Sequence, residues 1–252
     1  MTTPVKIAWK AVTKRFGDRT VLDGLSLDAH EGQSLVIIGG SGTGKSVMLK
    51  TALGLIAPDT GLVEIDGQRV RPGDPSDPGL DQIGMLFQSG ALFDSLTVWE
   101  NVAFKLLKAH KMKRAEARER AIEALKQVDL EADVAGRAPR ELSGGMLKRA
   151  ALARAIVTKP AILFFDEPTT GLDPVTADVI NRLIVRQVKS LGATAVTITH
   201  DMASMRMIAD EVAMIEHGKI RWRGGLNGIN DCADPAVCAF VQGRSVDDAP
   251  NP

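Results

Sequence analysis

The stretch SLVIIGGSGTGKSVMLK, residues 34–50, limits the possible fold more than any other. An apolar run that we expect to be a strand leads into glycines, and Lys45 and Ser46 then complete the pattern G-x-x-x-x-G-K-[ST] before an expected helix. Glycine-permissive backbone lets several N–H groups point at a phosphate chain, while the lysine meets the β- and γ-phosphates and the hydroxyl meets Mg²⁺. A glycine-rich turn without nucleotide is the alternative, which the flanking elements disfavour.

Further apolar runs alternate with helical stretches: QIGMLFQ, AILFFDEP, TAVTITH and EVAMIEHGKI. This alternation favours an α/β fold with a mostly parallel sheet. Residues 5–30 and 62–70 predict a small antiparallel layer, with a hairpin turn at Asp66-Gly67 and a loop over residues 71–80. We expect an inserted helical lobe at about residues 90–155. In it, KRAEARERAIEALKQVDL reads as a solvated helix with a buried stripe of Ile122, Leu125 and Val128.

The composition is ordinary for a globular protein, with 252 residues, 44% of them hydrophobic and 25% charged. Lys+Arg 31 and Asp+Glu 31 balance, so no overall charge steers the chain to nucleic acid or to an anionic membrane. Cys232 and Cys238 show no metal-ligand pattern, which fits a reducing compartment. No run approaches the length of a membrane-spanning helix, and we expect a cytoplasmic chain without a secretory signal.

Two further motifs carry chemistry. The apolar run AILFF ends in Asp166 and Glu167, and such strand ends face the ligand crevice of open α/β sheets. Asp166 would hold Mg²⁺, and Glu167 would orient or deprotonate a water; without the phosphate loop, both would read as turn-capping acids. In ELSGGMLKRA, Ser143 can cap a helix, and the positive end of that helix, beside Gly144 and Gly145, can form an anion site. The alternative is a helix cap that binds no ligand.

These motifs, with Gln88, GLDP and His200, occur in the order of an ABC-type ATPase cassette, and the resemblance covers nearly the whole chain. It implies a P-loop NTPase fold of the ABC ATPase type over residues 1–243, followed by a tail over residues 244–252. It also implies ATP and Mg²⁺ as cofactors. Phe16 resembles the aromatic residue that stacks on adenine, Gln88 resembles the Mg²⁺ and water ligand, and His200 resembles the switch histidine. Taken alone, Phe16 could be a core residue and Gln88 a surface amide. His200 could be a strand-end side chain that is satisfied by local hydrogen bonds.

The resemblance assigns nucleotide contacts to Phe16, Gly39, Gly40, Ser41, Gly42, Thr43, Gly44, Lys45, Ser46, Val47, Ser143, Gly144, Gly145 and Asp173. It assigns catalysis to Glu167, His200 and Gln88, and Mg²⁺ to Ser46, Gln88 and Asp166. In the family, the Ser-Gly-Gly turn binds the γ-phosphate of a nucleotide held by the other cassette. Since this chain shows no internal duplication, two copies would pair head to tail, with the Asp173 loop linking the two sites.

Met146 stands where most of the family has glutamine, and together with GALFDSLTVWENVAF and DEPTTGLDPVTA it resembles the ATPases of Mla-type lipid transporters. That resemblance implies an ATPase subunit of a phospholipid transporter, peripheral on the cytoplasmic face of the inner membrane. Its partners would be an integral membrane permease and periplasmic or membrane-anchored lipid-binding components, and not nucleic acid. Leu92, Phe93 and Leu96 are candidate permease contacts, with core packing an equal alternative.

Other functions remain open at this point. An importer of amino acids or another small solute is the nearest alternative. A soluble ABC ATPase acting on nucleic acid or ribosomes would normally show twin cassettes or coiled-coil insertions, and a small-molecule kinase would leave LSGG and His200 without a task.

At the C-terminus, Pro235 suits a helix start and Gly243 its end. Val237, Phe240 and Val241 would form the apolar stripe of that helix. We expect residues 244–252 to extend toward the partner cassette, or else to be disordered.

Overall fold

The computed structural model describes residues 3–74, 76–230 and 233–243. It divides into two compact units, Met1–Leu80 with Val196–Pro252, and Asp81–Ala195. The described part has the alternating strands and helices that the sequence predicts. No helix in that part is both long and apolar enough to cross a bilayer.

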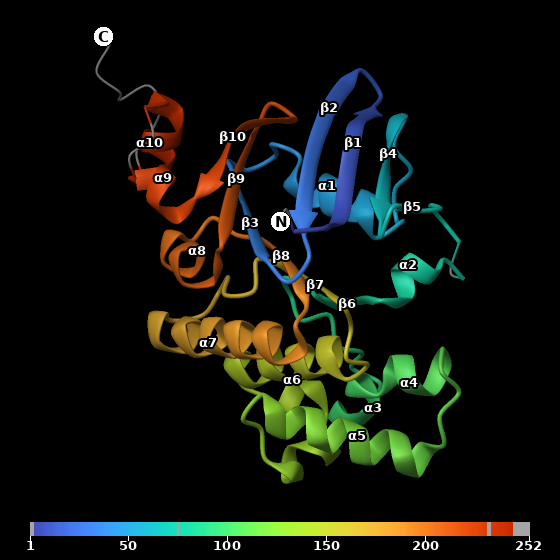
Figure 1. Ribbon diagram of the computed structural model, residues 1–252. Helices are drawn as coiled ribbons and strands as arrows, with labels where there is room; N and C mark the ends of the chain where they lie inside the picture. The colour runs from blue at the N-terminus through green and yellow to red at the C-terminus, as the bar shows by residue number, and fades with distance from the viewer. Residues whose placement is uncertain (1–2, 75, 231–232, 244–252) are drawn as a thin grey trace. The chain divides into compact units, whose positions relative to one another are not determined.

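The first unit contains the predicted antiparallel layer. The strands β1 (Val5–Phe16), β2 (Arg19–His30), β4 (Thr60–Ile65) and β5 (Gln68–Arg69) form a sheet in the order β2-β1-β4-β5. Asp66 (φ 51°) and Gly67 (φ 72°) make the turn between β4 and β5, which confirms the predicted hairpin. Helix α1 (Lys45–Ala52) packs on this sheet (Figure 1), where the buried Trp9 donates a hydrogen bond from Nε1 to the carbonyl of Met48 at 3.2 Å.

The same unit contains the strand that precedes the phosphate loop. All five residues of β3 (Ser34–Ile38) are buried, and β3 pairs in parallel with β9 (Glu211–Glu216). β10 (Lys219–Gly225) pairs with β9 in the antiparallel direction, so the run EVAMIEHGKI is a hairpin that turns at His217 and Gly218 rather than one strand. The sequence analysis did not single out this turn, although the His-Gly pair, which has positive φ at both residues, marks it.

Three short helices complete the first unit: α8 (Met202–Ile208), α9 (Leu226–Asn230) and α10 (Pro235–Val241). The predicted C-terminal helix begins at Pro235, with Asp234 capping the N–H groups of Ala236 and Val237. Gly243 has the positive φ of 66° expected after a helix end. The buried side is formed by Ala236, Val237 and Ala239, so the proposed stripe is wrong for Phe240 and Val241, which are only half-buried. The tail 244–252 and Cys232 lie outside the described residues.

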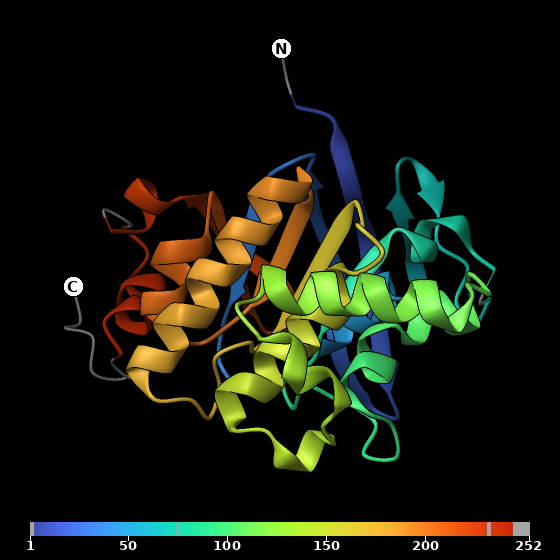
Figure 2. The same cartoon turned by 90° about the horizontal axis from the view of Figure 1, so that it is seen from below.

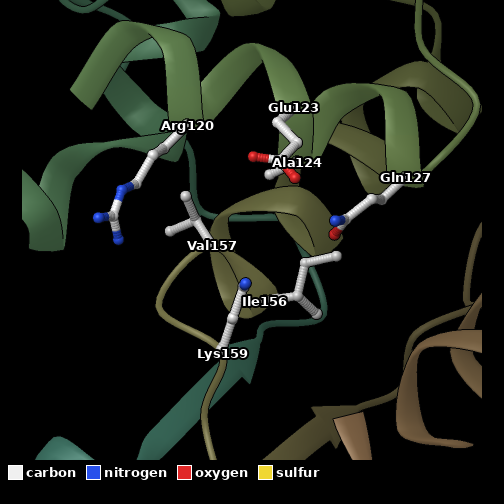
Figure 3. Close-up of a pocket in the computed structure, with 7 residues that line it drawn as sticks. All are labelled: Arg120, Glu123, Ala124, Gln127, Ile156, Val157 and Lys159. Carbon is white, nitrogen blue, oxygen red and sulfur yellow. The ribbon is translucent and has the colours of Figure 1, made fainter. Parts of the chain in front are cut away.

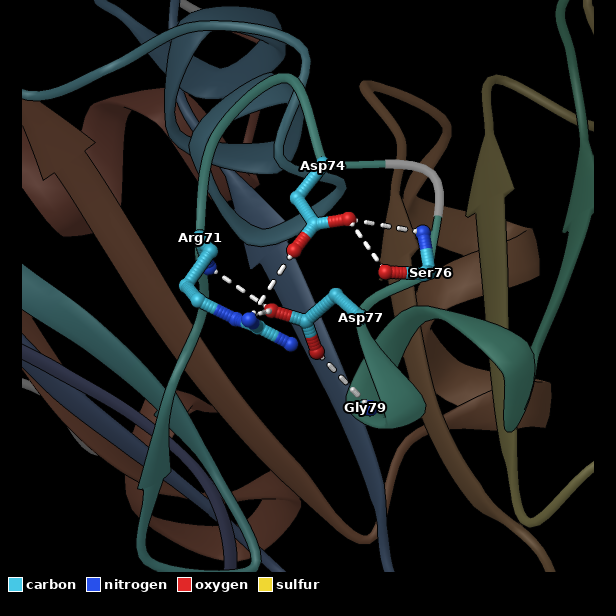
Figure 4. Close-up of polar contacts among 5 residues, drawn as sticks. All are labelled: Arg71, Asp74, Ser76, Asp77 and Gly79. Atoms are coloured by element: carbon cyan, nitrogen blue, oxygen red, sulfur yellow. Dashed lines mark hydrogen bonds and ion pairs between the residues drawn. The ribbon is translucent and has the colours of Figure 1, made fainter.

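A polar network orders the loop that follows β5. Asp77 is buried, and it accepts hydrogen bonds from the backbone N–H of Arg71 at 2.7 Å and of Gly79 at 2.9 Å. The Arg71 guanidinium also pairs with Asp74 and Asp77 (Figure 4). The predicted loop over residues 71–80 is therefore correct only to residue 77, because the short helix α2 (Pro78–Asp81) begins where Asp77 meets the N–H of Gly79.

In the second unit, the strands β6 (Ile83–Leu86) and β7 (Ile162–Asp166) pair in parallel. Between them in sequence lie the helices α3 (Val98–Val102), α4 (Phe104–Lys108), α5 (Arg114–Gln127) and α6 (Gly144–Ile156), with short 3₁₀ turns at Ala132–Gly136 and Pro139–Glu141. Helix α7 (Pro174–Leu191) follows β7, and it packs on α6 (Figure 2). Strand β8 (Thr194–Ile198) runs through the boundary between the two units and is fully buried. The proposed boundaries of the helical lobe remain a prediction.

The buried face of α5 differs from the expected stripe. Leu125 and Val128 are buried, but Ile122 is only half-buried, and the face consists mainly of Ala117, Ala121 and Ala124. Helices α3 and α6 both contact α5. Small side chains let helix backbones approach closely, so the alanines carry this contact and the larger isoleucine does not. The predicted stripe is therefore correct for Leu125 and Val128 and wrong for Ile122, and it left out the alanines.

Gly61 tests the antiparallel layer. It has φ 77°, and a Cβ there would lie 2.3 Å from the carbonyl oxygen of Ala11. Gly67 has a similar φ of 72° but open space around it. Gly67→Ala should cost about 1–2 kcal/mol of stability from the unfavourable φ alone. Gly61→Ala should cost about 1–3 kcal/mol more from the backbone clash. Urea unfolding of both variants measures the difference, and equal losses would contradict the close packing of β1 on β4.

Candidate functional site: a phosphate loop and a signature helix

The loop between β3 and α1 is shaped by glycines at positive φ. Gly39, Gly42 and Gly44 have φ values of 146°, 74° and 110°. At Gly39 a Cβ would lie 2.3 Å from the carbonyl oxygen of Ile215 on β9, and at Gly44 it would lie 2.8 Å from the carbonyl oxygen of Val21. The loop therefore lies against both neighbouring strands with no room for side chains at these positions. A helix N-terminus preceded by such a loop is suited to bind phosphate groups.

Lys45 holds the loop together from within. Its ammonium donates to the carbonyls of Gly39 at 2.8 Å and Gly40 at 2.7 Å, and the Thr43 hydroxyl donates to the Gly40 carbonyl at 3.0 Å. Ser41 and Ser46 are exposed. The Lys45 ammonium lies at the mouth of the loop, where a cation can meet a phosphate chain.

A cavity of about 250 Å³ adjoins the loop. It brings together six of the predicted residues, Phe16, Gly42, Gly44, Lys45, Ser46 and Val47, with Arg19 and Val21 of β2. Phe16 is 49% exposed, so it offers a ring face for a planar ligand rather than filling the core. The remaining predicted loop residues, Gly39, Gly40, Ser41 and Thr43, do not line this cavity.

The sequence reading missed Arg19 and Val21. Arg19 donates from Nη2 to the carbonyl of Gly42 at 3.4 Å. Both residues follow the turn that Phe16 precedes. Arg19 and Val21 could have been predicted from the sequence. Because β2 pairs with β1 in the antiparallel direction, the first residues of β2 lie close to Phe16.

In the second unit, Asp166 ends β7 and Glu167 follows it, as predicted. Glu167 has φ 49°, a left-handed backbone that is uncommon for glutamate and is typical of functional sites. Thr170 donates from Oγ1 to Glu167 Oε2 at 3.1 Å and so orients the carboxylate.

A buried cation lies near these two acids. Lys148 on α6 is 5% exposed and donates a hydrogen bond from Nζ to the backbone carbonyl of Gln88. Burial lowers the pKa of the Lys148 ammonium, while the Asp166 and Glu167 carboxylates act to raise it. Gln88 itself is exposed. The sequence reading did not single out Lys148, because a lysine beside Arg149 on a helix resembles a solvated surface cation.

Ser143 caps α6 as predicted, accepting a hydrogen bond at Oγ from the N–H of Met146 at 3.3 Å. Helix α6 begins at Gly144, so both glycines lie in its first turn. A Cβ at Gly145 would lie 2.7 Å from Thr176 Cγ2, so this glycine also permits packing against α7. The helix start remains exposed at Ser143 and Gly144.

Asp173 caps α7, accepting from the N–H groups of Val175 and Thr176 at 3.0 Å each. Its hydrogen bonds with the Thr176 hydroxyl and backbone lower the pKa of the carboxyl. His200, the predicted switch histidine, follows β8 in the first unit and is exposed. Asp201, next to it, caps α8 through the N–H groups of Ala203 and Ser204.

A second cavity, of about 300 Å³, lies in the second unit between α5 and the end of α6 (Figure 3). Arg120, Glu123 and Gln127 of α5 surround it, and Ile156 and Val157 form an apolar floor. It contains none of the predicted site residues. Its larger size therefore does not make it the better candidate site, because the chemical groups of the motifs lie elsewhere.

The glycine loop, Lys45 and the carboxylates that end β7 define a P-loop nucleotide-binding protein. The sequence matches the ABC transporter family over residues 22–170, which is more than half of the chain. The chain therefore belongs to the ABC transporter family, and it is an ATP-binding ATPase subunit of that family.

Curated relatives cover nearly the whole chain. Protein TRIGALACTOSYLDIACYLGLYCEROL 3, chloroplastic, of Arabidopsis thaliana is 39% identical, over 95% of this chain and 74% of its own. The intermembrane phospholipid transport system ATP-binding protein MlaF of Escherichia coli is 37% identical, over 94% of this chain and 87% of its own. The sulfate/thiosulfate import ATP-binding protein CysA of Caulobacter vibrioides is also 37% identical, over 93% and 69%.

Solved structures confirm the fold class. The dimeric structure of MJ0796, a bacterial ABC transporter cassette, superposes with a TM-score of 0.78 and 34% identity. The match covers 87% of this chain and 98% of that cassette. The same cassette is known as a dimer in a post-hydrolysis state bound to ADP and Pi.

Lys45 and Lys50 offer a matched pair of substitutions on α1. Lys45→Ala removes the cation at the mouth of the loop and should abolish tight ATP binding without unfolding the chain. Lys50→Ala removes an exposed cation from the end of the same helix and should leave ATP affinity unchanged. Isothermal calorimetry with ATP compares the variants. Undiminished affinity in Lys45→Ala would refute the assigned role of this loop.

Proposed function

We propose that this chain is the ATP-hydrolysing subunit that powers a membrane transporter of phospholipid, of the Mla type. The observation that carries the proposal is the near end-to-end similarity to MlaF, in which both chains are covered almost completely. The Arabidopsis relative, whose name is that of a diacylglycerol glycolipid, supports the same substrate class. Met146 after the two glycines supports it independently, on the resemblance to Mla-type ATPases.

The residues have the following roles in the proposal. Phe16 stacks on adenine, and the loop Gly39–Ser46 with Val47 holds the phosphates, where Lys45 meets the β- and γ-phosphates. Glu167 orients and deprotonates the attacking water, its carboxylate being aimed by Thr170. Gln88 and His200 approach the same water and the γ-phosphate.

Mg²⁺ is the metal that we propose for this site. Ser46, Gln88 and Asp166 offer a hydroxyl, an amide oxygen and a carboxylate, which are the hard oxygen donors that Mg²⁺ accepts alongside phosphate oxygens. Mg²⁺ held by these residues would supply positive charge against the negative charge that develops on the phosphates. Ser46 and Gln88 are exposed, so neither donor is committed to the core.

Two copies would close on two ATP molecules. Ser143, Gly144 and Gly145 start a capped helix that is exposed and can meet the γ-phosphate of a nucleotide on the other copy. Asp173 orders the loop beside it through its cap of α7. The dimeric arrangement of the similar cassette MJ0796 supports this pairing. A head-to-tail pair with a twofold axis gives each site one half from each copy.

The remaining partners follow from the transport role. The chain would dock, on the cytoplasmic face of the inner membrane, on an integral membrane permease, whose complex would include periplasmic or membrane-anchored lipid-binding components. Phe93 is 47% exposed, while Leu92 and Leu96 are half-buried, so Phe93 is the stronger candidate contact of the three. Its ring packs on Phe104 at 4.9 Å, which fixes it on the surface.

Import of a small solute is the second candidate, because CysA has the same identity to this chain as MlaF. The covered share of the relative distinguishes the two, since this chain spans 87% of MlaF and 69% of CysA. Phospholipid therefore remains the preferred substrate class.

Glu167→Gln tests the hydrolytic role. The amide keeps the shape and a hydrogen bond to water but is not a base, so ATP turnover should fall by about 10² or more. ATP should still bind, and the variant should accumulate as an ATP-bound dimer. Phosphate release and light scattering measure the two effects. Full turnover by this variant would remove Glu167 from the mechanism.

The substrate class is tested on the assembled transporter. The chain should copurify with a multi-spanning membrane protein, identified by mass, and the complex in liposomes should move fluorescent phospholipid only with ATP. The Glu167→Gln complex is the inactive control. ATP-dependent uptake of sulfate or an amino acid by the complex, without phospholipid movement, would favour the second candidate.

A further inference from the structure

Helix α6 carries two cations that point at one backbone turn. Lys148 and Arg154 lie six residues apart on this helix, and both donate hydrogen bonds to carbonyls of residues 88–91. Lys148 bonds to Gln88, and Arg154 bonds to Gly90 at 2.8 Å and to Ala91 at 2.5 Å. The motif-based mechanism uses the Gln88 side chain and assigns no task to either cation.

The turn itself is strained and tightly packed. Gly90 and Ala91 have φ values of 77° and 47°, and the Gly90 N–H donates to the Phe87 carbonyl at 2.8 Å. A Cβ at Gly90 would lie 2.4 Å from Leu147 Cδ2 on α6. A left-handed alanine costs free energy and persists only where its surroundings hold it. The three hydrogen bonds from Lys148 and Arg154 join these contacts in holding the turn against α6.

Burying the two cations is costly in itself. Lys148 is 5% exposed, and removing an ammonium from water is unfavourable unless nearby groups compensate. The Gln88 carbonyl and the carboxylates of Asp166 and Glu167 provide that compensation. Arg154 is half-buried, with its guanidinium 6.0 Å from the centre of the Phe87 ring. A hydrophobic residue would fill both positions at lower cost if packing were their only purpose.

We propose that Lys148 and Arg154 are positioning residues that fix the turn Phe87–Ala91 to α6, so that Gln88 and the signature turn Ser143–Gly145 move as one body. Lys148 is the central member, because it is buried on α6 and donates its hydrogen bond to the backbone of Gln88 itself. A nucleotide phosphate at Ser143 would thereby set the position of Gln88 through the length of one helix. This inference rests on the proposed ATPase site and adds the residues that couple its parts.

Hydrogen exchange tests the mechanical part on the full chain without nucleotide. Lys148→Met keeps a long side chain but removes the charge and the donor, so the amides of residues 87–91 should exchange at least about tenfold faster, while those of β7 stay protected. Lys148→Arg should restore slow exchange. Arg149→Met is the matched control, because Arg149 donates instead to the Asp129 carbonyl at 2.7 Å and should leave residues 87–91 unchanged.

ATP kinetics test the functional part. Lys148→Met should lower kcat by roughly 10- to 100-fold, the range that a small misplacement of catalytic groups produces. The KM for ATP should stay within about twofold, because Lys148 is not among the residues proposed to bind the nucleotide. Lys148→Arg should recover most of kcat, and Arg149→Met should behave as wild type. A merely structural residue would lower the melting temperature without this separation of kcat from KM.

The outcomes are distinct for the two proposals. Wild-type exchange at residues 87–91 together with wild-type kcat in Lys148→Met would overturn the inference and leave the ATPase function intact. If the wild-type chain hydrolysed no ATP, the proposed function would fail, and hydrogen exchange would still decide whether the cations hold the turn. If Lys148→Met did not fold, Arg154→Met is the second variant. It should speed exchange at Gly90 and Ala91 and lower kcat, and an unchanged value of both would overturn the inference.

Discussion

A triphosphate can be held by backbone N–H groups only where no side chain stands between the chain and the anion, and the rest of this structure depends on that constraint. Gly39 has no side chain, and its backbone lies so close to β9 that any Cβ would overlap the Ile215 carbonyl. The loop can have this path only because β3 and β9 lie in register behind it and α1 continues from Lys45. The antiparallel layer then supplies Phe16 beside the loop, so one unit carries the nucleotide-holding groups together.

The second unit contains Gln88, Asp166 and Glu167 and is organised around α6, while His200 belongs to the first unit. Its N-terminus presents Ser143 to solvent, its middle buries Lys148 near Asp166 and Glu167, and its last turn carries Arg154 to the Gly90 and Ala91 carbonyls. Glu167 and Ala91, the latter in the turn beside Gln88, both have left-handed backbones, as do six other non-glycine residues of the described chain.

The motifs could be read from sequence because glycine patterns and strand-end acids report backbone geometry directly. The hairpin at Asp66-Gly67 and the helix start at Pro235 were predictable for the same reason, since each needs a particular φ. Lys148 was not predictable, because its burial depends on where the turn after β6 folds back on α6. The prediction for α5 was correct for Leu125 and Val128 but missed the alanines, because their importance comes only from close packing with neighbouring helices. Local rules identified the groups, and tertiary contacts decided their environment.

The central claim is that the signature turn of one copy serves the nucleotide held by another. Ser41 of the phosphate loop and Ser143 of the signature turn are both exposed, and each can be changed to cysteine in a background with Cys232 and Cys238 replaced by serine. A mixture of the Ser41→Cys and Ser143→Cys chains, treated with a short bis-maleimide, should form a cross-linked heterodimer in ATP and little without it. Equal cross-linking with and without ATP, or a link formed only within a single doubly substituted chain, would contradict the account.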